Sequence, residues 1–247
     1  MTAPPGPAAG CEQAVAKAGA RATPSLVALA CIAVVLLTGV ARAQGRRPFD
    51  LPLAGPSGLA TWYVSHPYGN TIYSYYERAG MYESAQGMHM GLDFATPCGT
   101  PVLAIGDGNV RSVDGPGGAA PHNLMIAHDA GYVSFYGHLL ERPALTAGQR
   151  VSRGQQVALS GDMLGTCVDS PHLHLEVRDE TATRFENPVT LIEADWHGLL
   201  LLGPGGPQFA RDLDNPLRWQ SLDDQPPLQL GGPPLNDYAH SWPDDSQ

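Results

Sequence analysis

Two short segments of the chain carry side chains whose types and spacing suit metal chemistry. The first contains His89 and Asp93 with Gly91 between them, and the second contains His172 and His174. Side chains alternate along an extended strand, so His172 and His174 are predicted to share one face. If the first segment is also extended, His89 and Asp93 share a face, and Gly91 leaves room there for an ion. Two imidazoles and one carboxylate suit a zinc ion that keeps a fourth position open for water.

Each of these patterns also has an ordinary explanation when it is taken alone. The HxxxD spacing of His89 and Asp93 arises often by chance, and an HxH pair can lie on a solvated strand face. However, two polar side chains on one face of an otherwise apolar strand are costly unless something uses them. The occurrence of both segments in one chain therefore favours a metal site.

The elements that must position these residues are mainly β. Glycine (29 residues) and proline (23 residues) are abundant, and glycine-containing turns separate short apolar runs. We expect antiparallel sheets that form a sandwich or barrel-like domain with a groove, and irregular N- and C-terminal extensions. The predicted strands cover residues 101–105, 109–113, 124–128, 132–136, 155–160 and 172–178.

The chain ends differ from this middle region. Residues 44–87 are rich in aromatic pieces and are expected to form the N-terminal part of, or lead-in to, the main domain. One short helix is predicted over residues 189–202. The extension over residues 191–247 is rich in proline and glycine, which resist regular structure. It also carries Phe209, Trp219 and Trp242, so it is expected to lie against the domain.

The first 43 residues have the pattern of a signal peptide. Lys17 and Arg21 precede the apolar run 26–40, and residues 41–43 read Ala-Arg-Ala, which predicts cleavage before Gln44. An uncleaved anchor is the alternative. In both cases the remaining chain is expected outside the cytoplasm, and no stable membrane domain is expected unless the leader stays uncleaved.

Charge and cysteine content narrow the partners and the compartment. The formal net charge is −10 and Lys17 is the only lysine, so nucleic acid is not an expected partner. Cys98 and Cys167 are the cysteines that follow the leader. In an oxidising compartment they are expected to form one disulfide, although two unpaired thiols are compatible with the sequence. We expect a monomer.

With these segments in view, the sequence resembles the lysostaphin/LytM family of zinc endopeptidases. The family's H-x-G-x-D motif stands here at residues 89–93, its Tyr-Gly-His-Leu motif at 136–139 and its H-x-H motif at 172–174. The stretches 94–97, 99–102, 148–157 and 160–161 are also similar to the family. The resemblance implies a peptidase domain over residues 88–190. Where the family has Gly-Asn-Thr-Gly before H-x-H, this chain has Gly-Asp-Met-Leu-Gly at 161–165, which puts the specificity in doubt.

The resemblance implies a role for each site residue. His89, Asp93 and His174 would bind one zinc ion per chain. His138 and His172 would be the catalytic histidines, with His172 as general base and His138 stabilising the oxyanion, an order that the sequence leaves open. The implied activity is hydrolysis of peptide cross-links in bacterial peptidoglycan by an exported metalloendopeptidase. The bond that is cleaved stays open.

Other functions and other residues were weighed against this one. A catalytically silent regulator of cell-wall hydrolases is the main alternative, although all five site residues are present. A two-histidine iron oxygenase typically shows HxD spacing, and a biotin or lipoyl carrier needs an exposed lysine that is missing after the leader. His128 is expected at a strand end near the site, and His122 is expected to line the groove. His66, His197 and His240 are expected to be solvated. Glu176 is expected to have a structural role.

Overall fold

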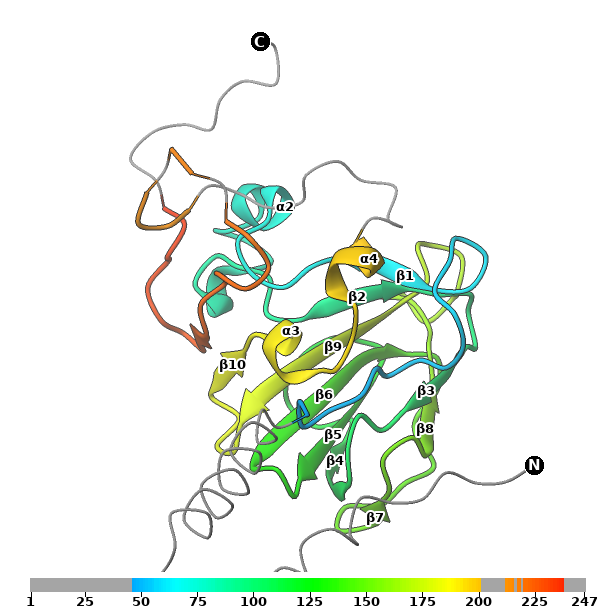
Figure 1. Ribbon diagram of the computed structural model, residues 1–247. Coiled ribbons are helices and arrows are strands. Elements are labelled where there is room, and N and C mark those ends of the chain that lie inside the picture. Colours follow the sequence, from blue (N-terminus) through cyan, green and yellow to red (C-terminus); the bar gives the residue numbers. More distant parts are fainter. Residues whose placement is uncertain (1–45, 201–211, 216, 219, 238–247) are drawn as a thin grey trace, which may run out of the picture. The chain divides into compact units, whose positions relative to one another are not determined.

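The computed structural model describes residues 46–200, 212–215, 217–218 and 220–237 (Figure 1). The predicted signal peptide therefore lies outside the described residues, as do Phe209, Trp219, Trp242 and His240. Within the described part, no helix is long and apolar enough to cross a membrane. The predicted divisions after residues 43, 87 and 190 stay predictions.

One large antiparallel sheet carries most of the structure, and among the described strands it stays open instead of closing into a barrel. Its path runs β1-β2-β9-β6-β5-β4-β7, and β10 and β11 extend it beside β9. A separate two-stranded sheet pairs β3 with β8. The mainly β, antiparallel prediction is confirmed, and each of the six predicted strands overlaps an observed one. The strands of the large sheet are β1 (Tyr63–His66), β2 (Leu92–Ala95), β4 (Gly108–Val113), β5 (His122–His128), β6 (Tyr132–Leu139), β7 (Arg150–Val151), β9 (His172–Asp179), β10 (Arg184–Glu186) and β11 (Leu228–Gln229), and those of the small sheet are β3 (Pro101–Leu103) and β8 (Gln156–Leu159).

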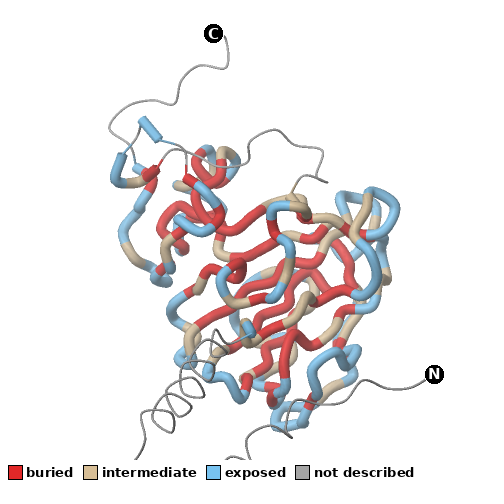
Figure 2. The backbone as a smooth tube through the Cα atoms, in the orientation of Figure 1, coloured by how far each residue is buried: buried red, intermediate tan, exposed pale blue. Residues whose placement is uncertain are grey.

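Strand β9 lies at the centre of the sheet and separates two chemical environments. Leu173, Leu175 and Val177 on one face are fully buried in the hydrophobic core, which Figure 2 shows as continuous red along the central strands. Burial of each such side chain contributes roughly 1.5–3 kcal/mol. Because side chains alternate, the other face of β9 carries polar groups from His172 onward. The core therefore fixes the direction in which these polar groups project.

The single helix predicted over residues 189–202 is wrong. Two short helices occur instead, α3 (Pro188–Leu191) and α4 (Trp196–Leu200). Asn187 caps α3 through its side chain, but Ile192 has extended backbone and forms a parallel bridge with Phe49. This long-range pairing interrupts the helix, because Glu193 N donates to Phe49 O at 2.8 Å.

The C-terminal extension packs against the segment that precedes the metal-binding motif. This segment contains α2 (Ile72–Tyr76) and η2 (Glu83–Ala85), and Figure 1 shows the C-terminal residues beside α2. Asn70 N donates to Gln225 Oε1 at 2.6 Å, and Asn236 Nδ2 donates to Gly87 O at 2.6 Å. Gly69 has a φ of +101°, and a Cβ there would collide with Gln225. The expectation that the extension lies against the domain holds for its described residues.

Candidate metal centre

Three donor atoms converge at the middle of the sheet, two from the neighbouring strands β2 and β9 and one from His89, which precedes β2. Strands β2 and β9 pair so that Asp93 lies directly opposite His174. His174 Nδ1 lies 2.7 Å from Asp93 Oδ1 and 3.3 Å from His89 Nε2, and His89 Nε2 lies 3.4 Å from Asp93 Oδ1. Sequence positions some eighty residues apart are thus brought to one point.

The separations of these atoms fit a zinc ion. Four ligands at 2.0–2.1 Å in tetrahedral geometry stand about 3.3 Å from one another. Both distances from His89 Nε2 are close to this value, whereas Asp93 and His174 are closer and share a hydrogen bond. Two imidazole nitrogens and one carboxylate oxygen also match the ligand types of catalytic zinc sites. The residues therefore fit the ion that the resemblance implies.

The hydrogen bonds on the far side of each ring select the nitrogen that faces this point. His89 Nδ1–H donates to Pro67 O at 2.8 Å, which leaves Nε2 with its lone pair toward Asp93. His174 Nε2–H donates to Glu176 Oε1 at 3.1 Å, so Nδ1 faces Asp93 and would bind a metal after giving up the proton that it donates to Asp93. Such outer partners fix the tautomer and ring orientation of metal-binding histidines.

Glu176 belongs to this arrangement, although its sequence position predicted an ordinary structural role. Its side chain is 1% exposed, and its second oxygen accepts a 2.5 Å hydrogen bond from Arg178 Nε. A buried carboxylate is costly unless it is paired in this way. The alternation of His172, His174 and Glu176 along the strand was the sequence signal that could have linked Glu176 to the site.

The charges at the centre stabilise one another strongly. Burial alone would raise the pKa of Asp93, but the neighbouring His89 and the hydrogen bonds from histidines hold it well below its ordinary value. Burial would likewise lower the pKa of His174, but its hydrogen bonds with Asp93 and Glu176 raise it to about 10. The two shifts have the same origin, which is attraction between an anion and a cation in a buried site.

His138 and His172 lie together beside this centre, with ring centroids 4.7 Å apart. His138 Nδ1–H donates to Ala120 O at 2.6 Å, and His172 Nδ1–H donates to Ser170 O at 2.8 Å. Each ring therefore keeps Nε2 available for proton transfer. Burial and the charge of His174 lower the pKa of His138 to about 4. His138 also has a φ of 56°, a backbone conformation that is uncommon outside glycine and occurs often at functional sites.

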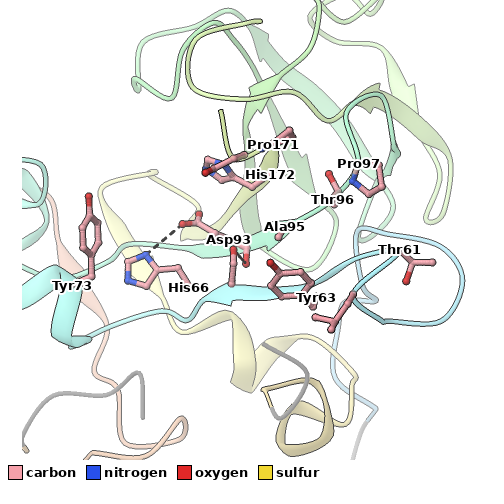
Figure 3. Close-up of a pocket in the computed structure, with 13 residues that line it drawn as sticks. Thr61, Tyr63, His66, Tyr73, Asp93, Ala95, Thr96, Pro97, Pro171 and His172 are labelled. Carbon is pink, nitrogen blue, oxygen red and sulfur yellow. Dashed lines mark hydrogen bonds and ion pairs between the residues drawn. The ribbon is translucent and has the colours of Figure 1, made fainter. Parts of the chain in front are cut away.

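The prediction that His66 is solvated is wrong. Its ring stacks on that of His89, with centroids 3.9 Å apart and planes 3° from parallel, and its Nδ1 lies 3.4 Å from Asp93 Oδ2. Figure 3 shows His66 and His172 on either side of Asp93. Donor atoms of His66, His89 and Asp93 all lie within 4.8 Å of one another, so His66 competes with His174 as a third ligand. We favour His174 because its Nδ1 lies 2.7 Å from the Asp93 carboxylate, whereas His66 Nδ1 lies 3.4 Å from it.

The other histidines that the structure describes lie outside the centre. His128 ends strand β5 as predicted, but it pairs with Gly108 at the end opposite His122 and packs on Phe49, so the expectation that it lies near the site is wrong. His122 bonds Asp114 through Nδ1 at 3.1 Å. His197 is exposed, as expected.

Two features hold the ligand-bearing segments together. The structure pairs Cys98, which follows β2, with Cys167, which precedes β9, and their Cα atoms lie 5.7 Å apart. The loop around Cys167 is organised by buried Asp162, whose carboxylate accepts hydrogen bonds from the backbone of Leu164, Thr166, Val168 and Asp169. Burial would raise the pKa of Asp162, but the hydrogen bonds that its carboxylate accepts lower this pKa to about 2.

A cleft gives access to the centre. One cavity of about 600 Å³ is lined by Tyr63, Thr96 and Ser170 and reaches Asp93 (Figure 3). A second cavity of about 380 Å³ contains the metal-binding candidates and shares His66, Tyr73, Asp93 and His172 with the first. The arrangement can therefore present an extended chain to a metal ion and two imidazoles.

Comparison with known proteins agrees with this chemistry. Residues 87–187 match the description "Peptidase family M23". The chain is 38% identical over 104 residues to an uncharacterized metalloprotease of Haemophilus influenzae (42% of this chain, 21% of that protein) and 44% identical over 89 residues to the peptidoglycan DD-endopeptidase ShyB of Vibrio cholerae (36% and 20%). It thus spans about a fifth of these relatives. Among solved structures, the chain is similar to a zinc-containing peptidase from Vibrio cholerae. The two sequences are 30% identical, the TM-score is 0.41, and the match covers 54% of this chain and 37% of that one.

Proposed function

Because residues 87–187 form a peptidase family M23 domain, we propose that the protein is a zinc endopeptidase that cleaves peptide cross-links of bacterial peptidoglycan outside the cytoplasm. The observation that carries the proposal is the convergence of His89 Nε2, Asp93 Oδ1 and His174 Nδ1 beside two further imidazoles. The similarity to a peptidoglycan DD-endopeptidase supports the choice of substrate.

In this proposal, one group of residues binds the metal ion and a second group transfers the proton. His89, Asp93 and His174 would hold zinc, which when bound lowers the pKa of water and polarises a carbonyl. His172, oriented by Ser170 O, takes the proton from the attacking water at Nε2. We assign stabilisation of the developing oxyanion to His138, whose ring lies beside that of His172.

The test separates metal binding from proton transfer. Purified protein should contain one zinc per chain and release peptides from isolated peptidoglycan, as read by mass spectrometry of the fragments. His172→Ala should keep its zinc and lose about 10²–10⁴ in rate, whereas Asp93→Ala should lose both zinc and activity. Zinc retention without any hydrolysis would instead favour a silent regulator of other hydrolases, and absence of zinc would contradict the metalloenzyme.

His66→Ala distinguishes the two possible third ligands. If His174 is the ligand, His66→Ala keeps stoichiometric zinc and His174→Ala does not. The reverse result would assign His66 to the metal and require a different role for His174. Zinc content after dialysis against a weak chelator gives this answer without any measurement of activity.

A further inference from the structure

The polar face of β9 continues past the metal centre. His174, Glu176 and Arg178 occupy alternate positions of the strand and are joined in series by hydrogen bonds of 3.1 and 2.5 Å. Alternate residues project to the same face, and four residues of strand span about 13 Å. Arg178 therefore lies on the same face of the sheet as the metal centre, about 13 Å from His174 along the strand.

A cavity of about 500 Å³ opens at this point. It is lined by Arg178 and Arg111 together with apolar side chains such as Phe185 and Met125, and none of the described residues that line it carries a carboxylate. It shares Ser84, Met90 and Gly117 with the cavity that contains the metal-binding candidates, so the two adjoin. A pocket with two arginines stands out on a chain whose net charge is −10.

The guanidinium of Arg178 is held in a form suited to binding an anion. Its carbon lies 4.9 Å from the centroid of the Phe135 ring and 4.8 Å from that of Phe185, and the residue is 5% exposed. The rings fix the plane of the guanidinium, and Nε bonds Glu176. The rigid fork of arginine matches a carboxylate through two parallel hydrogen bonds. An arginine fixed in this way loses little conformational entropy when it binds.

Arg111 reaches the pocket from β4, which β5 and β6 separate from β9 in the sheet. It projects from β4 and donates through Nη1 to Glu180 O at 3.0 Å, in the turn between β9 and β10. This bond anchors an otherwise exposed side chain at the rim of the cavity. Both arginines are therefore positioned by neighbours before any ligand arrives.

We propose that this cavity is a subsite that binds a carboxylate of the peptide substrate through Arg178 and Arg111. The inference rests on the proposed peptidase function. An extended peptide advances about 3.3–3.6 Å per residue, so the carboxylate would lie three or four residues from the scissile bond, or nearer if a long side chain carries it. The subsite thus selects acidic peptides and sets the position of the bond to be cut.

The test compares two probes on one protein. A synthetic cross-linked peptide with free carboxylates and the same peptide fully amidated are bound to the zinc-loaded His172→Ala variant, and the affinities are read by fluorescence anisotropy. We expect about tenfold tighter binding of the free carboxylate form. Adding Arg111→Gln should bring the ratio of the two affinities close to one.

Arg150→Gln is the matched control, because Arg150 is an exposed arginine that pairs with Asp129 away from the cavity. It removes the same charge and should keep the tenfold ratio. Equal affinities for both peptides before Arg111 is changed, or an unchanged ratio after it, would overturn the inference. Hydrolysis of isolated peptidoglycan by the unsubstituted protein is scored separately, so that failure of the subsite is distinguished from failure of the peptidase function.

Discussion

Glu176 accepts a hydrogen bond from His174 Nε2 at 3.1 Å, while Asp93 faces the other nitrogen of the same ring. The imidazole is therefore oriented from both sides. A carboxylate behind a metal-binding histidine raises the basicity of the ring and keeps it in one tautomer.

Replacing Glu176 by glutamine should weaken zinc binding by about 10–100-fold. The amide carries no charge and leaves the Arg178 guanidinium without its anionic partner, so the His174 ring loses its orientation and basicity. Competition with a fluorescent chelator measures the affinity. Glu141→Gln, an exposed change of the same kind, should leave it unaltered. If Glu176→Gln binds zinc as tightly as the original chain, this role for Glu176 is wrong.

Gly91 should not tolerate even a methyl group. A Cβ at this position would lie 2.6 Å from Leu175 O and 2.7 Å from His174 Cε1. The space that the sequence suggested for an ion is thus taken by the His174 ring. Gly91→Ala should destabilise the fold by about 1–3 kcal/mol and weaken zinc binding, as read by denaturant unfolding and metal analysis. Gly80→Ala, whose Cβ would meet only a side-chain oxygen at 3.5 Å and a carbonyl at 3.8 Å, is the control.

Removal of the Cys98–Cys167 pair should lower the free energy of unfolding. The bridge closes a loop with a sequence separation of 69, and the chain-entropy model gives roughly 4 kcal/mol for a loop of that size. Cys98→Ser, Cys167→Ser and the double variant should all lose the same amount, because each one breaks the single bridge. Unchanged stability together with unchanged zinc retention would show that the pair has no role in joining the two ligand-bearing segments.

His128 should make stability depend on pH. Burial lowers its pKa to about 4; Nδ1–H donates to Asp107 O, and Nε2 accepts from the Ser134 hydroxyl. The unfolded chain takes up a proton near pH 6.5 and the folded chain does not, so stability falls as pH decreases from about 6.5 to 4. The loss from this residue is about 3 kcal/mol. Denaturant unfolding of His128→Gln should show a slope against pH smaller by this contribution, and an equal slope would contradict it.

The parts of the site that follow from local sequence were predictable, and those that depend on strand pairing were not. The shared face of His172 and His174 follows from the alternation of side chains along one strand, and the apolar residues Leu173 and Leu175 indicate which face is buried. His66 joins the centre because β1 pairs with β2 and shifts register between Val64 and His66. No local pattern around His66 indicates that pairing.

The same reason explains the helix that was predicted wrongly. Residues 189–202 have helical composition, but Ile192 leaves the helix to pair with Phe49, more than 140 positions earlier in the chain. The six strands were predicted correctly because each is marked by an apolar run and flanking turn residues within its own segment. Interactions between distant segments decided the elements that were missed.

The hydrogen bonds that join Gln225 and Asn236 to the stretch before His89 have a practical consequence for protein engineering. His89 is itself tied to that stretch, since Gly69 and His89 exchange two backbone hydrogen bonds of 2.8 and 3.0 Å. Expressing only the region of family similarity would remove both neighbours at once and leave backbone groups of His89, a proposed zinc ligand, without their partners. We therefore expect that a stable fragment of this domain must extend past that region in both directions.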